Sequence, residues 1–496
     1  MAKTKSPWLQ PHLLKLNFCL LSLVLFSSAN GYDGTQMNGF QSLTPWQEFF
    51  HRPTGSFLGL MNFMYWIGML VAFLFTPQIS NKWGRKIGLW LGVVFVAIGA
   101  AIQSCANSTA PFVVARGVIG FGAGFWGSNA PLLIGEMAHP DLRGVAGALY
   151  MCGFPVGSSV AAFATLGTLS YENSWSWRIP SILLIMLPCL AIPGLLMIPE
   201  SPRWLVSQGR TEEATRILVD WHAAGDLSSP LVCEEINAIQ VAIAFEDEAA
   251  NSNGYIDMLR TPGNRHRTFI TVTLGLWGNW VGIGVISYYF TLILNSVGIT
   301  DSRTQLIINA CMQVWNILWS VVGAMLIDKL GRRTLFLTSG AIMLVSFSLV
   351  TGLSGSFAQT KSAAVGIAVI PFLFLFYAGY DISLTPLMTA YPCEIWPYKL
   401  RSRGLTLQWI VGVLGASVNT FVNPIALDAI GWKYYFAYIA ILIVYCIVTY
   451  LFYPETRGYA LEQVAIIFDK DSAVVGEEPE DEKRVTVERA KEILKA

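Results

Sequence analysis

NKWGRK at residues 81–86 and DKLGRR at residues 328–333 are the two stretches that decide the fold of this chain. The second lies 247 residues after the first, and each separates two long apolar segments. An internal repeat at a fixed distance is the signature of a duplicated structural unit. Two further pairs repeat with spacings of 255 and 258 residues: Glu200 with Glu455, and Glu136 with Glu394. The sequence therefore predicts two related halves.

The composition indicates that both halves lie within a lipid bilayer. Of the 496 residues, 54% are hydrophobic and only 13% are charged, which is far from the average of soluble proteins. Basic and acidic residues number 32 each, so the net charge gives no sign of an anionic partner, and nothing in the sequence indicates nucleic-acid binding.

Twelve apolar stretches approach the length of about 20 residues that a helix needs to cross a bilayer. Only helices satisfy their backbone groups within lipid at this length, so strands are excluded. The predicted fold class is an all-α membrane protein with twelve transmembrane helices in two pseudo-symmetric six-helix bundles. The stretches lie near residues 14–39, 55–79, 87–104, 110–133, 144–170, 178–198, 268–296, 304–327, 334–353, 362–390, 404–427 and 434–453.

These stretches divide the chain into four parts. An N-terminal bundle covers residues 1–198, a linker with short helices 199–267, a C-terminal bundle 268–453, and a tail 454–496. The first stretch could pass for a cleaved secretory signal, but it continues to about Phe40, a spanning length. We therefore interpret it as the first transmembrane helix.

The distribution of Lys and Arg predicts the orientation in the membrane. Ten of these residues lie in four short loops on one side, whereas the loops on the other side hold only Arg52, Arg303, Lys361 and Lys433. Cytoplasmic loops carry the excess of basic residues. Both termini and the linker are therefore predicted to be cytoplasmic, and the plasma membrane is the expected location.

An ordered set of motifs along nearly the whole chain carries a family resemblance. It comprises Gly31-Tyr32-Asp33, Arg116 with Gly120, Gly122 and Gly124, Trp177-Arg178-Ile179-Pro180, Pro199-Glu200-Ser201-Pro202-Arg203-Trp204, Tyr288-Tyr289, Gly331-Arg332-Arg333 and Pro454-Glu455-Thr456-Arg457-Gly458. With these motifs the chain resembles the sugar porter family of the major facilitator superfamily, in its fungal lactose-permease-like and hexose-transporter-like branch. The resemblance implies a secondary active transporter that works by alternating access, without a cofactor.

The resemblance also implies a cytoplasmic gate of carboxylates and guanidinium groups at helix ends. Such pairs would form when the inner mouth closes and break when it opens. Asn81 stands where the family usually has Asp, so the gate of the first half is expected to be the weaker one. Ordinary interfacial charges that follow membrane topology are the alternative. The gate residues are Arg85, Glu136, Arg143, Glu200, Arg332, Glu394, Arg401 and Glu455.

Three ionisable residues within the predicted spans are candidates for proton coupling. Asp33 and Arg116 lie in the first and fourth helices, and Asp381 lies in the tenth. Ionisable side chains in a span are costly and usually mark ion or proton pathways. Asp33 also occupies a position that is Asp in related proton-coupled carriers, which favours proton symport. A permanently ionised structural pair, and a protonated structural Asp381 or a substrate contact by Asp381, remain as alternatives.

A sugar site needs polar partners for each hydroxyl group and aromatic platforms for the ring. Most positions that carry such groups in hexose porters are changed here: Thr389 stands at the position of a Trp, and Met151 at that of a Gln. A disaccharide, a cyclic polyol or acid, or a less polar metabolite fits better than glucose. Aromatic residues among the candidates could instead be core packing. The candidate substrate residues are Asn279, Trp280, Asn316, Tyr288, Tyr380, Thr389, Trp409 and Asn419.

Other function classes have less support in the sequence. No nucleophile–base set and no metal-ligand spacing appears in the polar segments, so an enzyme is not expected. The partners expected are a small sugar-like molecule, a proton and the lipid bilayer. A non-transporting nutrient receptor and a facilitator or exporter of a less polar metabolite stay open as alternatives.

Overall fold

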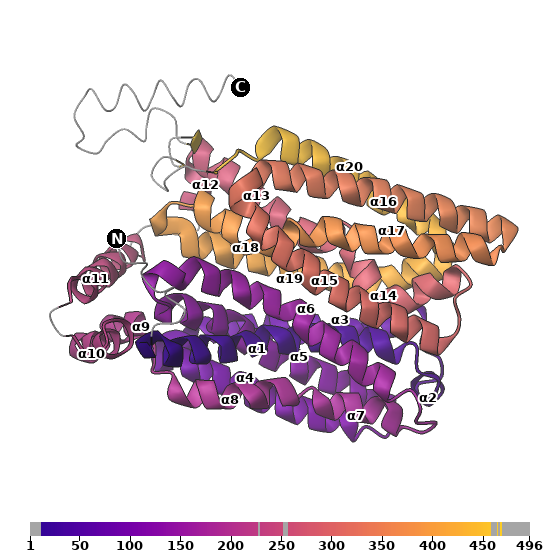
Figure 1. Ribbon diagram of the computed structural model, residues 1–496, viewed down its shortest axis with the longest axis horizontal. Coiled ribbons are helices and arrows are strands. Elements are labelled where there is room, and N and C mark those ends of the chain that lie inside the picture. Colours follow the sequence, from indigo (N-terminus) through magenta and orange to yellow (C-terminus); the bar gives the residue numbers. More distant parts are fainter. Residues whose placement is uncertain (1–10, 227–228, 251–255, 458–463, 465–466, 469–496) are drawn as a thin grey trace.

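The computed structural model describes residues 11–226, 229–250, 256–457, 464 and 467–468, and these residues form helices without a strand (Figure 1). Eleven apolar segments are long enough to cross a membrane, and the last of them, Arg403–Phe452, contains two helices joined by a turn. The described part of the chain therefore makes twelve crossings, as the sequence predicts.

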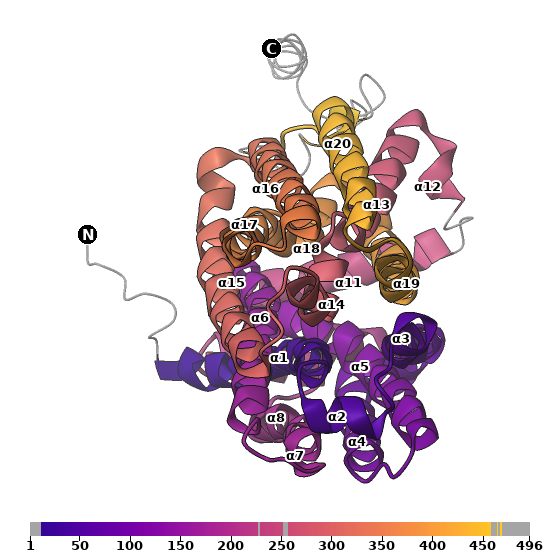
Figure 2. The same cartoon turned by 90° about the vertical axis from the view of Figure 1, so that its right-hand side faces the viewer.

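The helices gather in two bundles with the linker at one end. Figure 2 shows the bundle of the first half and that of the second half on either side of a common interface. The first half comprises α1 (Pro11–Phe40), α2 (Thr44–Phe49), α3 (Gly55–Trp83), α4 (Arg85–Ser104), α5 (Thr109–Met137), η2 (Pro140–Leu142), α6 (Arg143–Gly167), α7 (Trp175–Leu183) and α8 (Met186–Met197). The linker comprises α9 (Pro202–Ser207), α10 (Thr211–His222), α11 (Pro230–Ala250) and α12 (Asp257–Arg260). The second half comprises α13 (Pro262–Trp280), α14 (Ile283–Ser296), α15 (Ser302–Leu330), α16 (Arg332–Thr360), α17 (Ala363–Asp381), α18 (Leu384–Ile395), α19 (Tyr398–Ile430), η3 (Gly431–Tyr434) and α20 (Tyr435–Phe452).

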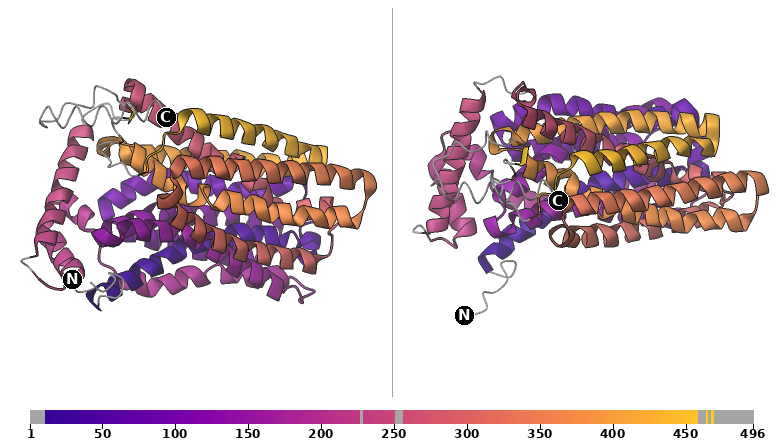
Figure 3. Two further views of the ribbon diagram at one scale, coloured as in Figure 1. Left: turned by 45° about the horizontal axis from the view of Figure 1, so that its top comes forward. Right: turned by 90° about the horizontal axis from the view of Figure 1, so that it is seen from above.

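The two ends of the molecule differ. The linker helices lie together at one end of the long helices in both views of Figure 3, and we call this the linker end. The short helix α2 lies at the opposite end, which we call the α2 end (Figure 1). Large apolar side chains cover the outer surface between the two ends: Leu74, Leu196 and Leu451 are each more than 60% exposed. A bilayer would cover such a surface.

Small residues bring helices of the first bundle into close contact. A Cβ at Gly31 in α1 would overlap the carbonyl oxygen of Phe154 in α6, and one at Gly157 in α6 would overlap that of Ser28 in α1. Small residues at helix interfaces allow this kind of backbone approach in membranes. The contact holds the turn of α1 that carries Asp33 directly against α6.

Three of the stretches that the sequence predicts as single helices are interrupted. The stretch 178–198 is divided into α7 and α8 between Leu183 and Met186. The stretch 268–296 is divided into α13 and α14 at Gly282, whose φ of 111° is accessible mainly to glycine, and α14 is kinked again at Tyr289. The stretch 362–390 is divided into α17 and α18 after Asp381. Interrupted helices expose backbone groups and commonly form the binding sites of transporters.

Candidate functional site

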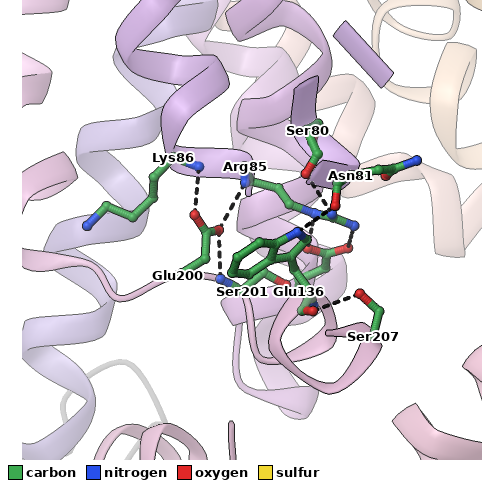
Figure 4. Close-up of polar contacts among 9 residues, drawn as sticks. Ser80, Asn81, Arg85, Lys86, Glu136, Glu200, Ser201 and Ser207 are labelled. Carbon is green, nitrogen blue, oxygen red and sulfur yellow. Dashed lines mark hydrogen bonds and ion pairs between the residues drawn. The ribbon is translucent and has the colours of Figure 1, made fainter. Parts of the chain in front are cut away.

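An ion pair joins two helix ends of the first bundle at the linker end. Arg85 is the first residue of α4, and Glu136 lies in the last turn of α5. The guanidinium donates from Nε to Glu136 Oε2 over 3.0 Å and from a terminal nitrogen to Oε1 over 3.1 Å (Figure 4). Two parallel bonds of this kind make the pair geometrically specific.

Glu200 binds the same helix end through the backbone. Its carboxylate accepts the N–H groups of Arg85 over 3.0 Å and of Lys86 over 3.1 Å, and that of Ser201 over 2.9 Å (Figure 4). These are unpaired donors of the first turn of α4, where the helix dipole also favours a negative charge. Gly84 permits this approach, because its φ is 98° and a Cβ there would overlap the carboxylate. Glu200 therefore caps α4 through the backbone.

The second bundle repeats this arrangement. Arg332 donates to Glu394 from Nε over 3.1 Å and from a terminal nitrogen over 2.8 Å. Glu455 accepts the N–H groups of Arg332 over 2.8 Å and of Arg333 over 3.0 Å. Gly331 has a φ of 90° and lies against this carboxylate. We call the two arrangements the first latch (Arg85, Glu136, Glu200) and the second latch (Arg332, Glu394, Glu455).

The other residues named with the gate are Arg143, Arg401 and Asn81. The side chain of Arg143 lies outside the part that the structure describes. Arg401 donates from Nε to the carbonyl of Trp396 over 3.4 Å. The side chain of Asn81 is exposed, and its carbonyl accepts from the indole of Trp204 over 2.9 Å. The carbonyl of Asn81 thus anchors the linker helix α9 beside the first latch.

Asp33 and Arg116 form a buried ion pair between α1 and α5. Their exposed fractions are 2% and 1%, and Arg116 donates from a terminal nitrogen to Asp33 Oδ1. The guanidinium also lies 5.2 Å from the ring centre of Tyr65. Asp33 Oδ2 and Arg116 Nε have no hydrogen-bond partner among the described residues. An incompletely satisfied ion pair is costly in a low-dielectric interior, and ionisable groups within a membrane span usually belong to ion or proton pathways.

Asp381 lies at the interruption between α17 and α18 and is 6% exposed. Thr385 donates to its Oδ1 over 2.7 Å. With its amide nitrogen turned towards the carboxylate, Asn316 of α15 donates to Asp381 Oδ2 over 3.3 Å. Gly323 allows this proximity, because the carbonyls of Asp381 and Ile382 pack directly on it. The structure thus brings a candidate proton carrier and a candidate substrate residue together.

Four candidate substrate residues of the second bundle bind backbone carbonyls around the interruption between α13 and α14. Asn279 donates to Gly412 over 3.0 Å, and Trp280 donates to Gly415 over 3.0 Å. Asn419 donates to the carbonyl of Asn279 over 2.7 Å, and Tyr380 donates to that of Gly278 over 2.9 Å. Bound in this way, these donors hold α13, α17 and α19 together.

The remaining candidates are not gathered at one place. Tyr288 is half-buried, and its ring is in edge contact with Trp66 of the first bundle at 6.3 Å between centres. Thr389 in α18 is half-buried, and Trp409 in α19 is 38% exposed. Of these three, Tyr288 is the residue that the structure places at the interface between the bundles.

Sequence reasoning missed a polar contact between the bundles towards the α2 end. Gln41 donates to the carbonyl of Tyr288 over 2.7 Å, and the hydroxyls of Ser42 and Thr291 are 2.8 Å apart. Nearby, Asn62 donates to the hydroxyl of Tyr289 over 3.3 Å. We call these contacts the interbundle seal. The cluster of Gln36, Asn38, Gln41 and Ser42 at the end of an apolar stretch is the signal that could have revealed it.

Comparison with known proteins identifies the family. The model of the family described as sugar (and other) transporter matches residues 19–468. The high-affinity glucose transporter of Kluyveromyces lactis is 27% identical over 88% of this chain and 81% of its own length. The sugar transporter STL1 of Saccharomyces cerevisiae is 30% identical over 82% of this chain and 71% of its own length.

The solved structures that match share the fold. The proton:xylose symporter XylE, a major facilitator superfamily protein, superimposes with a TM-score of 0.74 over 91% of this chain and 98% of that chain, at 21% identity. An inward-open structure of XylE from E. coli superimposes with a TM-score of 0.72. With the repeated latches and the twelve crossings, these matches lead to one conclusion: the chain is a multi-pass membrane protein of the sugar (and other) transporter family with the major facilitator fold.

Proposed function

We propose that this protein is a symporter that couples proton entry to the uptake of a sugar or sugar-like polyol. The observation that carries the proposal is the buried pair of Asp33 and Arg116, in which one oxygen of the carboxylate has no hydrogen-bond partner among the residues that the structure describes. A carboxyl group that leaves an arginine when it takes up a proton links protonation to a movement of α1 against α5. XylE, which has the same fold, is a proton:xylose symporter, and this is consistent with the proposed coupling.

Alternating access would use the two ends in turn. The interbundle seal holds α1 and α3 to α14 at the α2 end, while the two latches order helix ends at the linker end. Opening the α2 end requires that the seal breaks. The seal consists of a few neutral hydrogen bonds, so breaking it costs little free energy. We place the linker end in the cytoplasm, in accordance with the basic loops, and the protein in the plasma membrane.

The gain from coupling is large enough to matter. A membrane potential of roughly 100 mV contributes about 2.3 kcal/mol per charge, and one pH unit contributes about 1.4 kcal/mol. One proton per substrate could therefore sustain an accumulation of about several hundredfold.

The test is a substrate panel in proteoliposomes, with and without an imposed pH gradient. The panel should hold a hexose, a pentose, a disaccharide, a cyclic polyol and the corresponding acid. Uptake of a sugar or polyol against its gradient, together with alkalinisation outside, is the expected result. Uptake that ignores the pH gradient would indicate a facilitator, and binding without flux would indicate a receptor.

A second candidate is export of a less polar metabolite. It is favoured by the use of Asn279, Trp280 and Asn419 for backbone contacts, because these donors are then not available to sugar hydroxyls. Efflux from preloaded vesicles, driven by an opposite pH gradient, distinguishes this function from symport into the cell.

A further inference from the structure

His222, the last residue of α10, is a buried histidine at the point where three elements of the linker end meet. It is 3% exposed. Its Nδ1 lies 2.7 Å from Glu235 Oε2 in α11, and its Nε2 lies 3.0 Å from the carbonyl oxygen of Met137. Met137 ends α5 and directly follows Glu136 of the first latch. The imidazole therefore ties two linker helices to the turn that positions the latch.

Both ring nitrogens face oxygen acceptors, and this decides how many protons the contact needs. A neutral imidazole has one N–H, so it can donate to Glu235 or to Met137 but not to both. The doubly protonated ring donates to both at once. A proton on Glu235 instead would serve the same contact, which again requires one extra proton between these groups. The carbonyl end of α5 also favours a positive charge through the helix dipole.

The charged and titratable groups around His222 come from each element that packs there. Glu235 faces it from α11, and the ring of His139, between α5 and η2, lies 5.5 Å away in an edge contact. From α1, Lys15 lies over the ring of Trp221 at 4.5 Å rather than on the imidazole. Glu235 is thus the negative group in direct contact with the ring.

Among the described residues, the first latch lacks a hydroxyl contact that the second latch has, so the contact of His222 with Met137 takes a larger part in holding it. In the second latch the hydroxyl of Thr456 donates to Glu394 Oε2 over 2.5 Å. The corresponding hydroxyl in the first half, that of Ser201, accepts the N–H of Trp204 and caps α9. The turn of Glu136 is instead fastened through its neighbour Met137.

We propose that His222 is a positioning residue of the first latch, and that its protonated ring, held by Glu235, fastens linker helices α10 and α11 to the end of α5 that carries Glu136. The proposal rests on the proposed transport function, in which this latch forms and breaks. In consequence, docking of the linker is tightest in acid and loosens as the bridging proton is lost. The cytoplasmic pH would then act on the first latch.

Hydrogen exchange of the full-length protein in nanodiscs tests the proposal without any substrate. The peptides that cover residues 134–142 and 216–224 are followed between about pH 5 and pH 8, where histidines change charge. Rates are corrected for intrinsic exchange. In the wild type, protection of both peptides should fall by about tenfold as the pH rises, as expected for the loss of one charged hydrogen bond.

Two substitutions separate the bridging proton from simple packing. In Glu235→Gln the amide can donate to Nδ1 of a neutral ring, so Nε2 still donates to Met137 and protection should stay high at both pH values. His222→Ala should lose protection at both. Glu234→Gln, which changes the exposed neighbouring carboxylate, should behave as the wild type. Equal pH profiles of the wild type and Glu235→Gln, or unchanged protection in His222→Ala, would overturn the proposal.

The same variants separate this inference from the proposed transport function. If no compound of the panel is transported but the exchange pattern is as expected, the role of His222 in docking the linker is supported and the symport proposal fails. If transport is found and its dependence on the pH at the linker face is the same in Glu235→Gln and the wild type, the role of His222 in the latch is wrong.

Discussion

Thr456 donates a hydrogen bond of 2.5 Å to Glu394, so the second latch is held by a hydroxyl as well as by the guanidinium of Arg332. The equivalent Ser201 uses its hydroxyl to cap α9. The two halves share the same repeated motifs, but the equivalent hydroxyl groups of Thr456 and Ser201 bind different partners. The second latch joins its bundle to the segment that follows α20, whereas the first latch joins its bundle to the linker.

Thr456→Val should loosen the second latch. The substitution keeps the shape of the side chain but removes the donor to Glu394, which is 22% exposed, so we expect a loss of about 1 kcal/mol. Hydrogen exchange around residues 394–396 and at the start of α16 should rise. Ser201→Ala is the matched control: it should destabilise α9 by about 1 kcal/mol and leave Glu394 unaffected. Unchanged exchange at Glu394 in Thr456→Val would contradict the assignment.

Gly331→Ala should lower the stability of the protein by more than its backbone strain alone predicts. A Cβ there would lie 2.6 Å from Glu455 Oε2, in addition to the cost of a φ of 90°. The control is Gly209→Ala, where φ is 75° and nothing lies within 4 Å of the added atom. Strain alone is expected to cost about 1 kcal/mol in the control, and Gly331→Ala should exceed that by displacing the cap of α16. Thermal unfolding in detergent measures the difference in stability. An equal loss of stability in Gly331→Ala and Gly209→Ala would show that the Glu455 carboxylate moves away from the added Cβ at no cost.

Asp33→Asn should stop pH-driven accumulation and destabilise the fold. It leaves Arg116 buried without a counter-charge, which typically costs about 3–5 kcal/mol. The double substitution Asp33→Asn with Arg116→Gln removes both charges and should recover most of this stability. It should still exchange substrate across the membrane without a gradient but should not accumulate it. Accumulation driven by a pH gradient in Asp33→Asn would assign the pair a purely structural role.

Breaking the interbundle seal should shift the protein towards the state that is open at the α2 end. Ser42→Ala and Thr291→Val each remove a partner of the 2.8 Å contact between hydroxyls. A double-mutant cycle should give a coupling of about 1 kcal/mol. Spin-label distances across the α2 end report the equilibrium. Thr351→Val is the control, because this hydroxyl bonds within its own helix, to the carbonyl of Phe347. If the distance distribution is unchanged in the Ser42 and Thr291 variants, the seal has no role in the mechanism.

The sequence by itself determined the membrane spans, their number and their division into halves, but not the interruptions within three of them. Lipid requires that each span satisfies its own backbone, so apolar length alone locates a helix such as α3 or α16. In the repeated NKWGRK and DKLGRR motifs, Gly84 and Gly331 each end one helix directly before the next and leave room for a carboxylate. These are local constraints, and local constraints can be read along the chain.

Tertiary structure alone decided what each polar side chain binds. Asn279 and Trp280 were candidates for substrate, yet their donors reach carbonyls of α19, about 130 residues away along the chain. The proximity of Asn316 and Asp381 depends on how α15 packs against the interruption between α17 and α18. A hydrogen bond between distant segments depends on helix rotation and on the few ångströms of approach that small residues allow. The pattern of apolar residues fixes neither of these, because in a membrane every face of a helix can be apolar.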